Sequence, residues 1–309
     1  MAESVGTLYL CATPIGNLED MTPRALRMLR EANLIAAEDT RHTRQLLNHF
    51  DIHGTLLSYH EHNKEKMGPV LLEHLKEGKN IALVSDAGFP GISDPGEHIA
   101  QTCIAEGIPV VPVPGANAAL TALVASGLSS TPFFFGGFLP KSRKNRREKL
   151  AEWKDIPATI ILYEAPHRII EVLSDIEDAW GDRTMTMARE LTKLHEEFFR
   201  GTVSTCRAHL LEQAPRGEFV LVIAGGTKVE EAPTGDPLDA VRRLMADGVG
   251  KKEALQQIAK VYKLPKRELY NRLVKEGVED EKTSFFHYDT DLLSECQSAY
   301  WSCVLLDHC

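Results

Sequence analysis

Short apolar runs alternate with amphipathic segments along the first two thirds of the chain. The runs are apolar at successive positions and rich in β-branched residues, which is typical of strands buried on both faces of a sheet. The segments between them repeat apolar residues every three or four positions, which is the period of an α-helix. Strands are therefore expected within 7–17, 34–40, 80–88 and 108–115. Helices are expected within 22–33, 68–79, 94–107 and 116–127.

This alternation predicts an α/β domain over residues 1–128, built on a parallel sheet with helices on its faces. Thr22 followed by Pro23 is an N-cap signal for its first helix. In such sheets, ligands bind beyond the carboxyl ends of the strands. The loops expected at that edge are rich in small and polar residues, so we place the functional site there.

A second α/β domain, with a mixed sheet, is expected over residues 129–230. The segment 129–140, "SSTPFFFGGFLP", is interpreted as the boundary before it. Strands are expected early in 158–168 and 183–193 and within 217–226, with a helix over 168–181.

Three short helical patterns follow and predict a small, basic domain of helix-turn-helix type over residues 236–278. Asp236-Pro237 starts the first helix, and Pro265 precedes the third. The last stretch, 279–309, has no clear period and is expected to be a poorly ordered tail.

Composition narrows the classes of function. The net charge of −9 means that any contact with nucleic acid must come from local basic patches. The chain has six cysteines with no CxxC pair, and His53, His60 and His62 lack metal-ligand spacing, so neither a zinc site nor a disulfide framework is expected. No signal peptide or membrane span is indicated. We therefore expect a cytoplasmic protein without a metal or a membrane partner.

The segment 141–149 holds six basic residues and one acidic residue. This pattern favours contact with RNA phosphates, and a flexible solvated loop is the alternative. The candidate residues are Lys141, Arg143, Lys144, Arg146 and Arg147. In "EDTRHT", Arg41 is a candidate phosphate ligand, whereas the alternative is Asp39 as an N-cap within a solvated charge pair.

A glycine-rich loop follows the strand expected at 80–88. It reads "SDAGFPGISDPG" over 85–96 and contains no Lys, Arg or His and no phosphate-binding motif. Its carboxylates and exposed backbone suit a ligand that is cationic or rich in hydrogen-bond donors, and S-adenosylmethionine has both properties. The alternative is a tight turn in which Asp94 caps the next helix.

Eight motifs in register resemble the tetrapyrrole-methylase superfamily, and within it the branch that methylates small-subunit ribosomal RNA. They are "TPIGNLEDMTPRAL", "AEDTRHT", "VSDAGFPGISDPG", "PVPGANAALTAL", "GFLP", "YEAPHR", "ARELTKLHEE" and "GEFVLVI", between residues 7 and 277. The resemblance implies two α/β domains with S-adenosylmethionine in the cleft between them, a homodimer, and 2′-O-methylation of a cytidine ribose in 16S rRNA.

The resemblance also implies the residues of the donor pocket. They are Pro14, Ser85, Asp86, Ala87, Gly88, Pro114, Gly115, Ala116, Tyr163, Ala188 and Gly217. The chain departs from the family pattern at Phe89, where similar members have Thr. Phe89 either lines the pocket or packs on a dimer face.

Methyl transfer to a ribose hydroxyl needs a group that takes the proton and a group that stabilises the developing alkoxide. Glu190 or His167 is expected to take the proton, and Lys193 or Arg189 to stabilise the alkoxide. A structural ion pair between Arg189 and Glu190 is the alternative. Two other functions stay open: a methylase of a small tetrapyrrole, and a non-catalytic RNA-binding relative.

Overall fold

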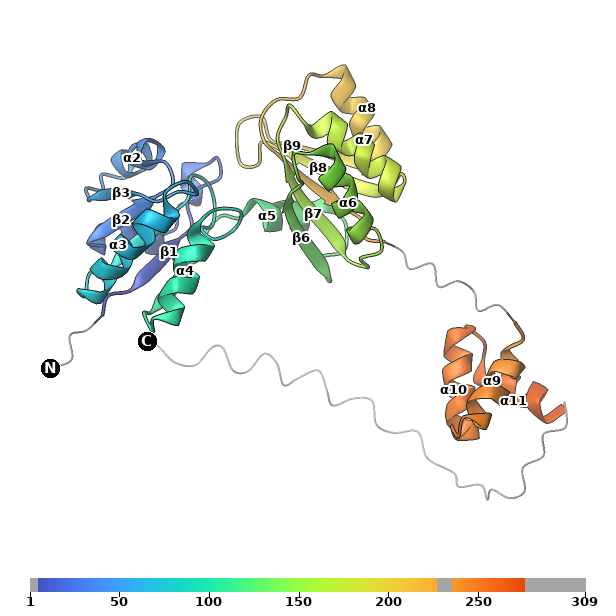
Figure 1. The fold of residues 1–309 in the computed structure, drawn as a ribbon. Helices are drawn as coiled ribbons and strands as arrows, with labels where there is room; N and C mark the ends of the chain where they lie inside the picture. Colours follow the sequence, from blue (N-terminus) through green and yellow to red (C-terminus); the bar gives the residue numbers. More distant parts are fainter. Residues whose placement is uncertain (1–4, 227–234, 276–309) are drawn as a thin grey trace. The chain divides into compact units, whose positions relative to one another are not determined.

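The computed structural model describes residues 5–226 and 235–275 (Figure 1). The tail predicted at 279–309 lies outside the described residues. The chain forms two compact units that divide between residues 228 and 229. The first unit holds both sheets.

The first sheet is parallel throughout, as predicted (Figure 1). Its strand order is β3 (Leu56–Ser58), β2 (Leu34–Ala37), β4 (Ile81–Val84), β1 (Leu8–Cys11) and β5 (Val110–Val113). Because all five strands run the same way, their carboxyl ends meet at one edge. The edge strand β3 was not predicted, since its three residues are only partly buried.

Helices cover both faces of this sheet. On one face lie α1 (Pro23–Glu31) and α2 (Thr40–His49), and on the other lie α3 (Lys64–Lys76) and α4 (Gly96–Ala105). A 3₁₀ turn, Leu18–Asp20, precedes α1. The predicted cap of α1 is confirmed, because Thr22 Oγ1 accepts a hydrogen bond from Ala25 N at 3.2 Å.

The second sheet is mixed, which confirms the prediction. Its order is β6 (Phe133–Phe138), β7 (Thr159–Glu164), β10 (Phe219–Ile223), β8 (Thr184–Arg189) and β9 (Glu197–Thr202). Only β6 and β7 run parallel, and the other neighbours are antiparallel. The "FFFGGF" segment, interpreted from sequence as a boundary, is thus an edge strand.

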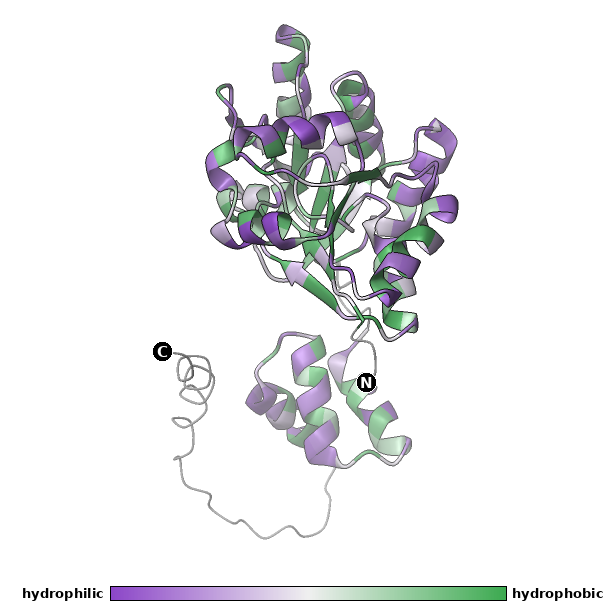
Figure 2. Ribbon diagram, turned by 90° about the vertical axis from the view of Figure 1, so that its left-hand side faces the viewer, coloured by the Kyte–Doolittle hydropathy of each residue, from purple (hydrophilic) through white to green (hydrophobic). Residues whose placement is uncertain are grey.

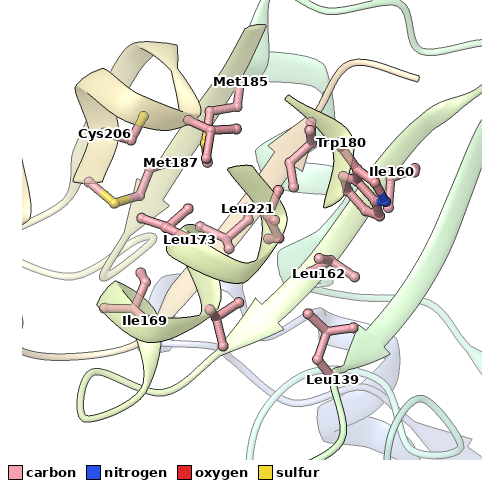
Figure 3. Packing of buried hydrophobic residues seen from close by; sticks show 14 of the residues in the cluster. Leu139, Ile160, Leu162, Ile169, Leu173, Trp180, Met185, Met187, Cys206 and Leu221 are labelled. Atoms are coloured by element: carbon pink, nitrogen blue, oxygen red, sulfur yellow. The ribbon is translucent and has the colours of Figure 1, made fainter. Parts of the chain in front are cut away.

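The second sheet also lies between helices. One face packs against α6 (Arg143–Trp153), α7 (Ile169–Trp180) and α8 (Val203–Glu212). In Figure 3, side chains such as Ile160, Leu162 and Leu221 from the strands share this core with residues of α7, among them Leu173.

The opposite face of the second sheet packs against α5 (Ala118–Ser126). Ala122 and Leu123 of α5 contact Ile161, Ala188 and Val220 in one apolar cluster. The helix that ends just before the predicted boundary at residue 128 therefore contributes to the core of the second sheet. It also joins the two sheets along the chain.

In the described part of the second unit, the helices are α9 (Pro237–Ala246), α10 (Lys251–Val261) and α11 (Lys266–Lys275). Asp236 caps α9 by accepting a hydrogen bond from Leu238 N at 3.0 Å. Figure 2 shows that these helices carry both hydrophobic and hydrophilic residues, as expected for helices around a small core. None of the described helices is long and apolar enough to cross a membrane.

Candidate functional site

The loops that follow β1, β2 and β4 are bonded to one another at the carboxyl edge of the first sheet. Thr13 and Gly88 exchange two backbone hydrogen bonds, at 2.8 and 3.1 Å. The Asp86 carboxylate accepts a hydrogen bond from Asp39 N at 3.0 Å. These bonds fix the glycine-rich loop against its two neighbours.

The glycine-rich loop is closed by its own aspartate. Asp94 Oδ1 accepts hydrogen bonds from Gly91 N at 2.7 Å and Gly96 N at 2.8 Å. The N-cap position of α4 is Pro95 rather than Asp94. Gly88 has a φ of +81°, a conformation that side chains disfavour. The loop therefore presents its backbone in a fixed and narrow turn.

A cavity of about 470 Å³ opens beside this loop, within the size range of small-molecule sites. Its lining comes from the strand ends of both sheets and from the start of α5. The lining residues are Ile15, Glu38, Ser85, Ala87, Gly88, Phe89, Ile92, Ser93, Asp94, Asn117, Ala118, Phe138, Tyr163, Glu164, Ala165, Pro166, Leu191, Glu218, Phe219 and Val220. The lining is thus mainly apolar, with a few polar groups.

The charged groups on this lining are all acidic. They are Glu38, Asp94, Glu164 and Glu218, and no Lys, Arg or His of the described chain lines the cavity. Burial raises the pKa of Glu164. Burial and then the nearby Asp86 carboxylate raise the pKa of Glu38. Carboxyl groups held in this way favour a ligand that brings positive charge or hydrogen-bond donors.

Glu164 has a polar atom without a hydrogen-bond partner. The residue is 3% exposed, and its Oε1 accepts a hydrogen bond from Ala165 N at 2.8 Å. Its Oε2 has no hydrogen-bond partner and lies 3.5 Å from Arg168 Nη2, which donates instead to the carbonyls of Leu139 and Pro140. Since buried polar atoms are nearly always paired, Glu164 Oε2 is suited to a donor group of a ligand.

The predicted donor-pocket residues fall into two groups. Ser85, Ala87, Gly88 and Tyr163 line the cavity. The others lie beside lining residues or behind them: Pro14, Asp86, Pro114, Gly115, Ala116, Ala188 and Gly217. For example, Ala188 is fully buried within the second sheet.

Phe89 lines the cavity, in a partly buried position. Of the two positions that the sequence left open for Phe89, the pocket or a dimer face, the structure therefore favours the pocket. Sequence reasoning had connected the carboxylates of the 85–96 loop, Asp94 among them, with a cationic ligand. It had not assigned Glu38, Asn117, Glu164 or Glu218 to the donor pocket. Asn117 could have been found, since its side chain caps α5 at Leu120 N at 2.9 Å.

Of the four residues expected to handle the proton and the alkoxide, Glu190 and Lys193 form an ion pair next to the cavity. Lys193 Nζ lies 2.9 Å from Glu190 Oε1 and 3.1 Å from Glu218 Oε2. Arg189 pairs with Glu197 at 3.0 Å, so the suggested ion pair between Arg189 and Glu190 does not form. His167 is exposed and follows Pro166, which lines the cavity.

Glu190 is tightly held within this network. Its Oε1 also accepts a hydrogen bond from Glu218 N at 2.9 Å. Burial by itself would raise the pKa of Glu190, but the hydrogen bonds from Lys193 and Glu218 outweigh it and lower that pKa. A carboxylate with a lowered pKa is a weaker proton acceptor.

The basic segment at 141–149 is largely a helix, α6, rather than a loop. Most of its cations are exposed, but Arg146 is 1% exposed. Arg146 Nη2 lies 2.6 Å from Asp175 Oδ2 and 2.6 Å from Glu171 Oε1 of α7. The assignment of Arg146 to RNA contact is therefore wrong, because its guanidinium holds α6 against α7.

Arg41 is exposed but already paired. Its Nε and Nη2 donate to both oxygens of Asp39, at 3.1 and 2.7 Å, and Asp39 also accepts from Arg41 N at the start of α2. The N-cap and charge pair that we gave as the alternative are thus both present. Binding of a phosphate by the fork of Arg41 would require this pair to open.

Metal ligation finds no support in the described part of the chain, where no group of three or more His, Cys, Asp or Glu side chains could hold an ion. Cys11, Cys103 and Cys206 are buried free thiols. Burial raises the pKa of Cys103 to about 11, so this thiol is not a nucleophile at neutral pH.

Comparisons with known proteins agree with this geometry. A family model described as Tetrapyrrole (Corrin/Porphyrin) Methylases matches residues 7–206. Ribosomal RNA small subunit methyltransferase I of Halalkalibacterium halodurans is 53% identical, over 86% of this chain and 94% of that protein. The protein of that name from Synechocystis sp. is 49% identical, over 86% of this chain and 96% of that protein.

A solved structure shows the same fold at low identity. Uroporphyrin-III C-methyltransferase from Thermus thermophilus, in complex with S-adenyl homocysteine, aligns with a TM-score of 0.51 at 18% identity, over 70% of this chain and 97% of that chain. The family model matches more than half of this chain, and about half of the residues are identical to the curated relatives over nearly their whole length. The chain therefore belongs to the tetrapyrrole methylase family, in the group of the ribosomal RNA small subunit methyltransferase I proteins.

Proposed function

We propose that this protein transfers a methyl group from S-adenosylmethionine to the 2′-hydroxyl of a cytidine ribose in 16S rRNA. The observation that carries the proposal is the acidic cavity without a cation at the strand ends. The names of the curated relatives support ribosomal RNA of the small subunit as the substrate. The choice of a cytidine and of its 2′-oxygen is what the resemblance of the sequence motifs to this family implies.

The cavity residues fit the donor. S-adenosylmethionine supplies an electrophilic methyl group on a sulfonium, and it also carries an amino group and ribose hydroxyls. We assign Oε2 of Glu164, which has no hydrogen-bond partner among the described residues, and the carboxyl of Glu38 to its donor groups or its positive charge. The S-adenyl homocysteine bound to the Thermus thermophilus enzyme supports a donor of this type.

The ion-pair network beside the cavity suggests roles for the remaining candidates. We assign stabilisation of the alkoxide to Lys193, because its partner Glu218 lines the cavity, whereas Arg189 is occupied by Glu197. We favour His167 over Glu190 as the proton acceptor, since Glu190 is held by Lys193 and by Glu218 N. Glu190 then acts as a positioning residue for Lys193.

The RNA surface that we propose lies on α6 and just before it. It comprises Lys141, Arg143, Lys144 and Arg147, all of them exposed. Arg143 and Arg147 lie near Asp175 and Asp178 of α7, so Lys141 and Lys144 carry the charge that no acidic partner offsets among the described residues. Contacts of this kind are sensitive to salt and independent of sequence.

We further propose a homodimer in the cytoplasm. Leu120 and Val124 of α5 are 47% and 77% exposed, although the other face of this helix is buried on the second sheet. A helix that is apolar on both faces is typical of one covered on both sides. A reducing compartment fits the buried free thiols.

Two measurements test the proposed function. Calorimetry should detect binding of S-adenosylmethionine to the full chain, and an absence of binding would remove the methyltransferase assignment. Mapping of 2′-O-methyl groups in 16S rRNA, from cells with and without this protein, should show one cytidine that loses its methyl group. An unchanged map would leave the fold in place and remove the proposed substrate.

Reversal of charge on the α6 surface should weaken RNA binding without affecting the donor. We expect Lys141→Glu combined with Lys144→Glu to lower the affinity for 16S rRNA about tenfold and to flatten its salt dependence, because two phosphate contacts are lost. Affinity is measured by filter binding at several salt concentrations. Lys66→Glu, at an exposed position of α3, is the matched control. Equal loss in both variants would show a general charge effect and contradict the assignment.

Shortening of Phe89 should weaken donor binding. Phe89→Ala removes an aromatic ring from the cavity lining, and we expect the Kd for S-adenosylmethionine to rise about tenfold because apolar contact is lost. Titration calorimetry measures this change. Phe89→Leu should recover part of the affinity, and an unchanged Kd in Phe89→Ala would show that the ring does not contact the donor.

A further inference from the structure

The three-helix unit is basic within an acidic chain. Residues 236–275 carry ten Lys and Arg against five Asp and Glu, whereas the net charge of the whole chain is −9. Such a concentration of one sign of charge on a small unit attracts an anionic partner.

Two of the acidic residues of this unit, at the start of α9, already form ion pairs with arginines. Asp236 caps α9 and pairs with Arg272 at 3.1 Å, and Asp239 pairs with Arg242 at 3.0 Å. By contrast, Lys252 on α10 and Arg267 and Lys275 on α11 have no ion-pair partner among the described residues. The excess positive charge therefore lies mainly on α10 and α11.

One face of α11 combines this charge with an exposed aromatic ring. Leu269 and Leu273 point into the core of the unit and are fully buried. The exposed residues of the remaining surface are Arg267, Glu268, Tyr270, Asn271, Val274 and Lys275. Among them, Arg267, Tyr270, Asn271 and Val274 follow the helical spacing of three and four positions that places side chains on one face. Tyr270 and Val274 are each 48% exposed.

A cation from the neighbouring helix stands over the same ring. Lys251 Nζ, at the start of α10, lies 5.8 Å from the centroid of the Tyr270 ring. The surface thus offers a flat aromatic group next to cations and an amide. We call Lys251, Arg267, Tyr270, Asn271 and Val274 the α11 face.

We infer that the α11 face binds an unpaired stretch of RNA, with a base stacked on Tyr270 and phosphates near Lys251 and Arg267. Single-stranded RNA is recognised by aromatic rings on which bases stack and by cations along the backbone. An exposed tyrosine within a basic surface supplies both. The inference rests on the proposed function and extends it, because it adds a second site of contact with the RNA substrate, the α11 face, on residues that follow those of the donor cavity in the sequence.

Unpaired RNA suits this face better than a duplex. The deep, narrow major groove of duplex RNA does not admit side chains that read bases. A three-helix unit of this kind also resembles DNA-reading modules in its connectivity, but contact with a DNA backbone would leave the ring of Tyr270 without a stacking partner. Duplex DNA is therefore the alternative that an experiment must separate.

The test is the binding of a labelled, unstructured 12-nucleotide RNA to the full chain, followed by fluorescence anisotropy. We expect Tyr270→Ala to weaken binding about tenfold, which is the size of one lost stacking contact. Tyr270→Phe keeps the ring and should bind like the original protein. Arg243→Glu, at an exposed position of α9, is the matched control for changes outside the α11 face and should have a smaller effect than Arg267→Glu.

This experiment distinguishes failure of the inference about the α11 face from failure of the proposed methyltransferase function. Tyr270 is exposed, so circular dichroism of Tyr270→Ala should be unchanged and binding of S-adenosylmethionine should be retained. Equal binding of Tyr270→Ala and the original protein would overturn the inference, as would tighter binding of duplex DNA than of the RNA. If the chain binds no S-adenosylmethionine but its RNA binding depends on Tyr270, the proposed function fails and this inference stands.

Discussion

Replacement of Asp175 by alanine is expected to lower the free energy of unfolding of the first unit by about 3 kcal/mol. Asp175 is fully buried, and its carboxylate holds Arg146 at 2.6 Å and Arg143 at 3.0 Å. Without it, the buried guanidinium of Arg146 keeps one ion-pair partner among the described residues, the half-exposed Glu171, and a long hydrogen bond to the Lys141 carbonyl at 3.4 Å. A buried charge that loses its main partner is among the most destabilising changes known for single residues. Urea unfolding of the full chain measures the loss.

Two further variants show whether the buried pair is the cause. Asp178→Ala removes the exposed partner of Arg147 and should cost less than about 1 kcal/mol. Asp175→Leu combined with Arg146→Met replaces both charges with apolar groups and should recover most of the stability, because a buried pair is often no better than a packed apolar one. Similar losses in Asp175→Ala and Asp178→Ala would contradict this explanation.

Arg146 shows which part of its role could be predicted from the sequence and which part required the tertiary structure. If residues 141–149 are interpreted as a loop, all six of their basic residues are expected to be equally exposed. Leu150 and Trp153 follow Arg146 by four and seven positions and are buried in the same helix, so the helical period already placed Arg146 on the buried face. Its partner Asp175 lies 29 positions later, and only the packing of α6 on α7 brings the two together.

The elements that were predicted are those with a strong apolar pattern. β4 and β10 are buried at every position, and both were expected. The missed strands β3, β6 and β9 are partly buried edge strands, where the pattern is weak. The same limit applies to the cavity, because no pattern within one segment shows that Glu38 and Glu164, at the ends of strands in different sheets, line a common space. Proximity of this kind arises from tertiary structure.

Glu164 is expected to affect donor binding and stability in opposite directions. Replacement by glutamine removes the negative charge but keeps an oxygen that can accept from Ala165 N. We expect the Kd for S-adenosylmethionine to rise at least tenfold, because a charge-assisted hydrogen bond in a buried site is lost. Glu218→Gln, at an exposed carboxyl of the same lining, should change the Kd much less.

The effect of Glu164→Gln on stability should depend on pH. Burial raises the pKa of Glu164 in the folded protein, so the folded state keeps a proton that the unfolded chain releases above about pH 4.3. The carboxyl therefore lowers the free energy of unfolding as the pH rises from this value through the folded pKa. Glutamine cannot release a proton, so the variant should match the original protein near pH 4 and be more stable near pH 8, as measured by urea unfolding without the donor. A variant that loses both stability and donor affinity at pH 8 would identify Glu164 as a structural residue. A variant that gains stability but loses binding would show that Glu164 is retained for its ligand, because Arg168, 3.5 Å away, would then not offset the cost of burying the charge.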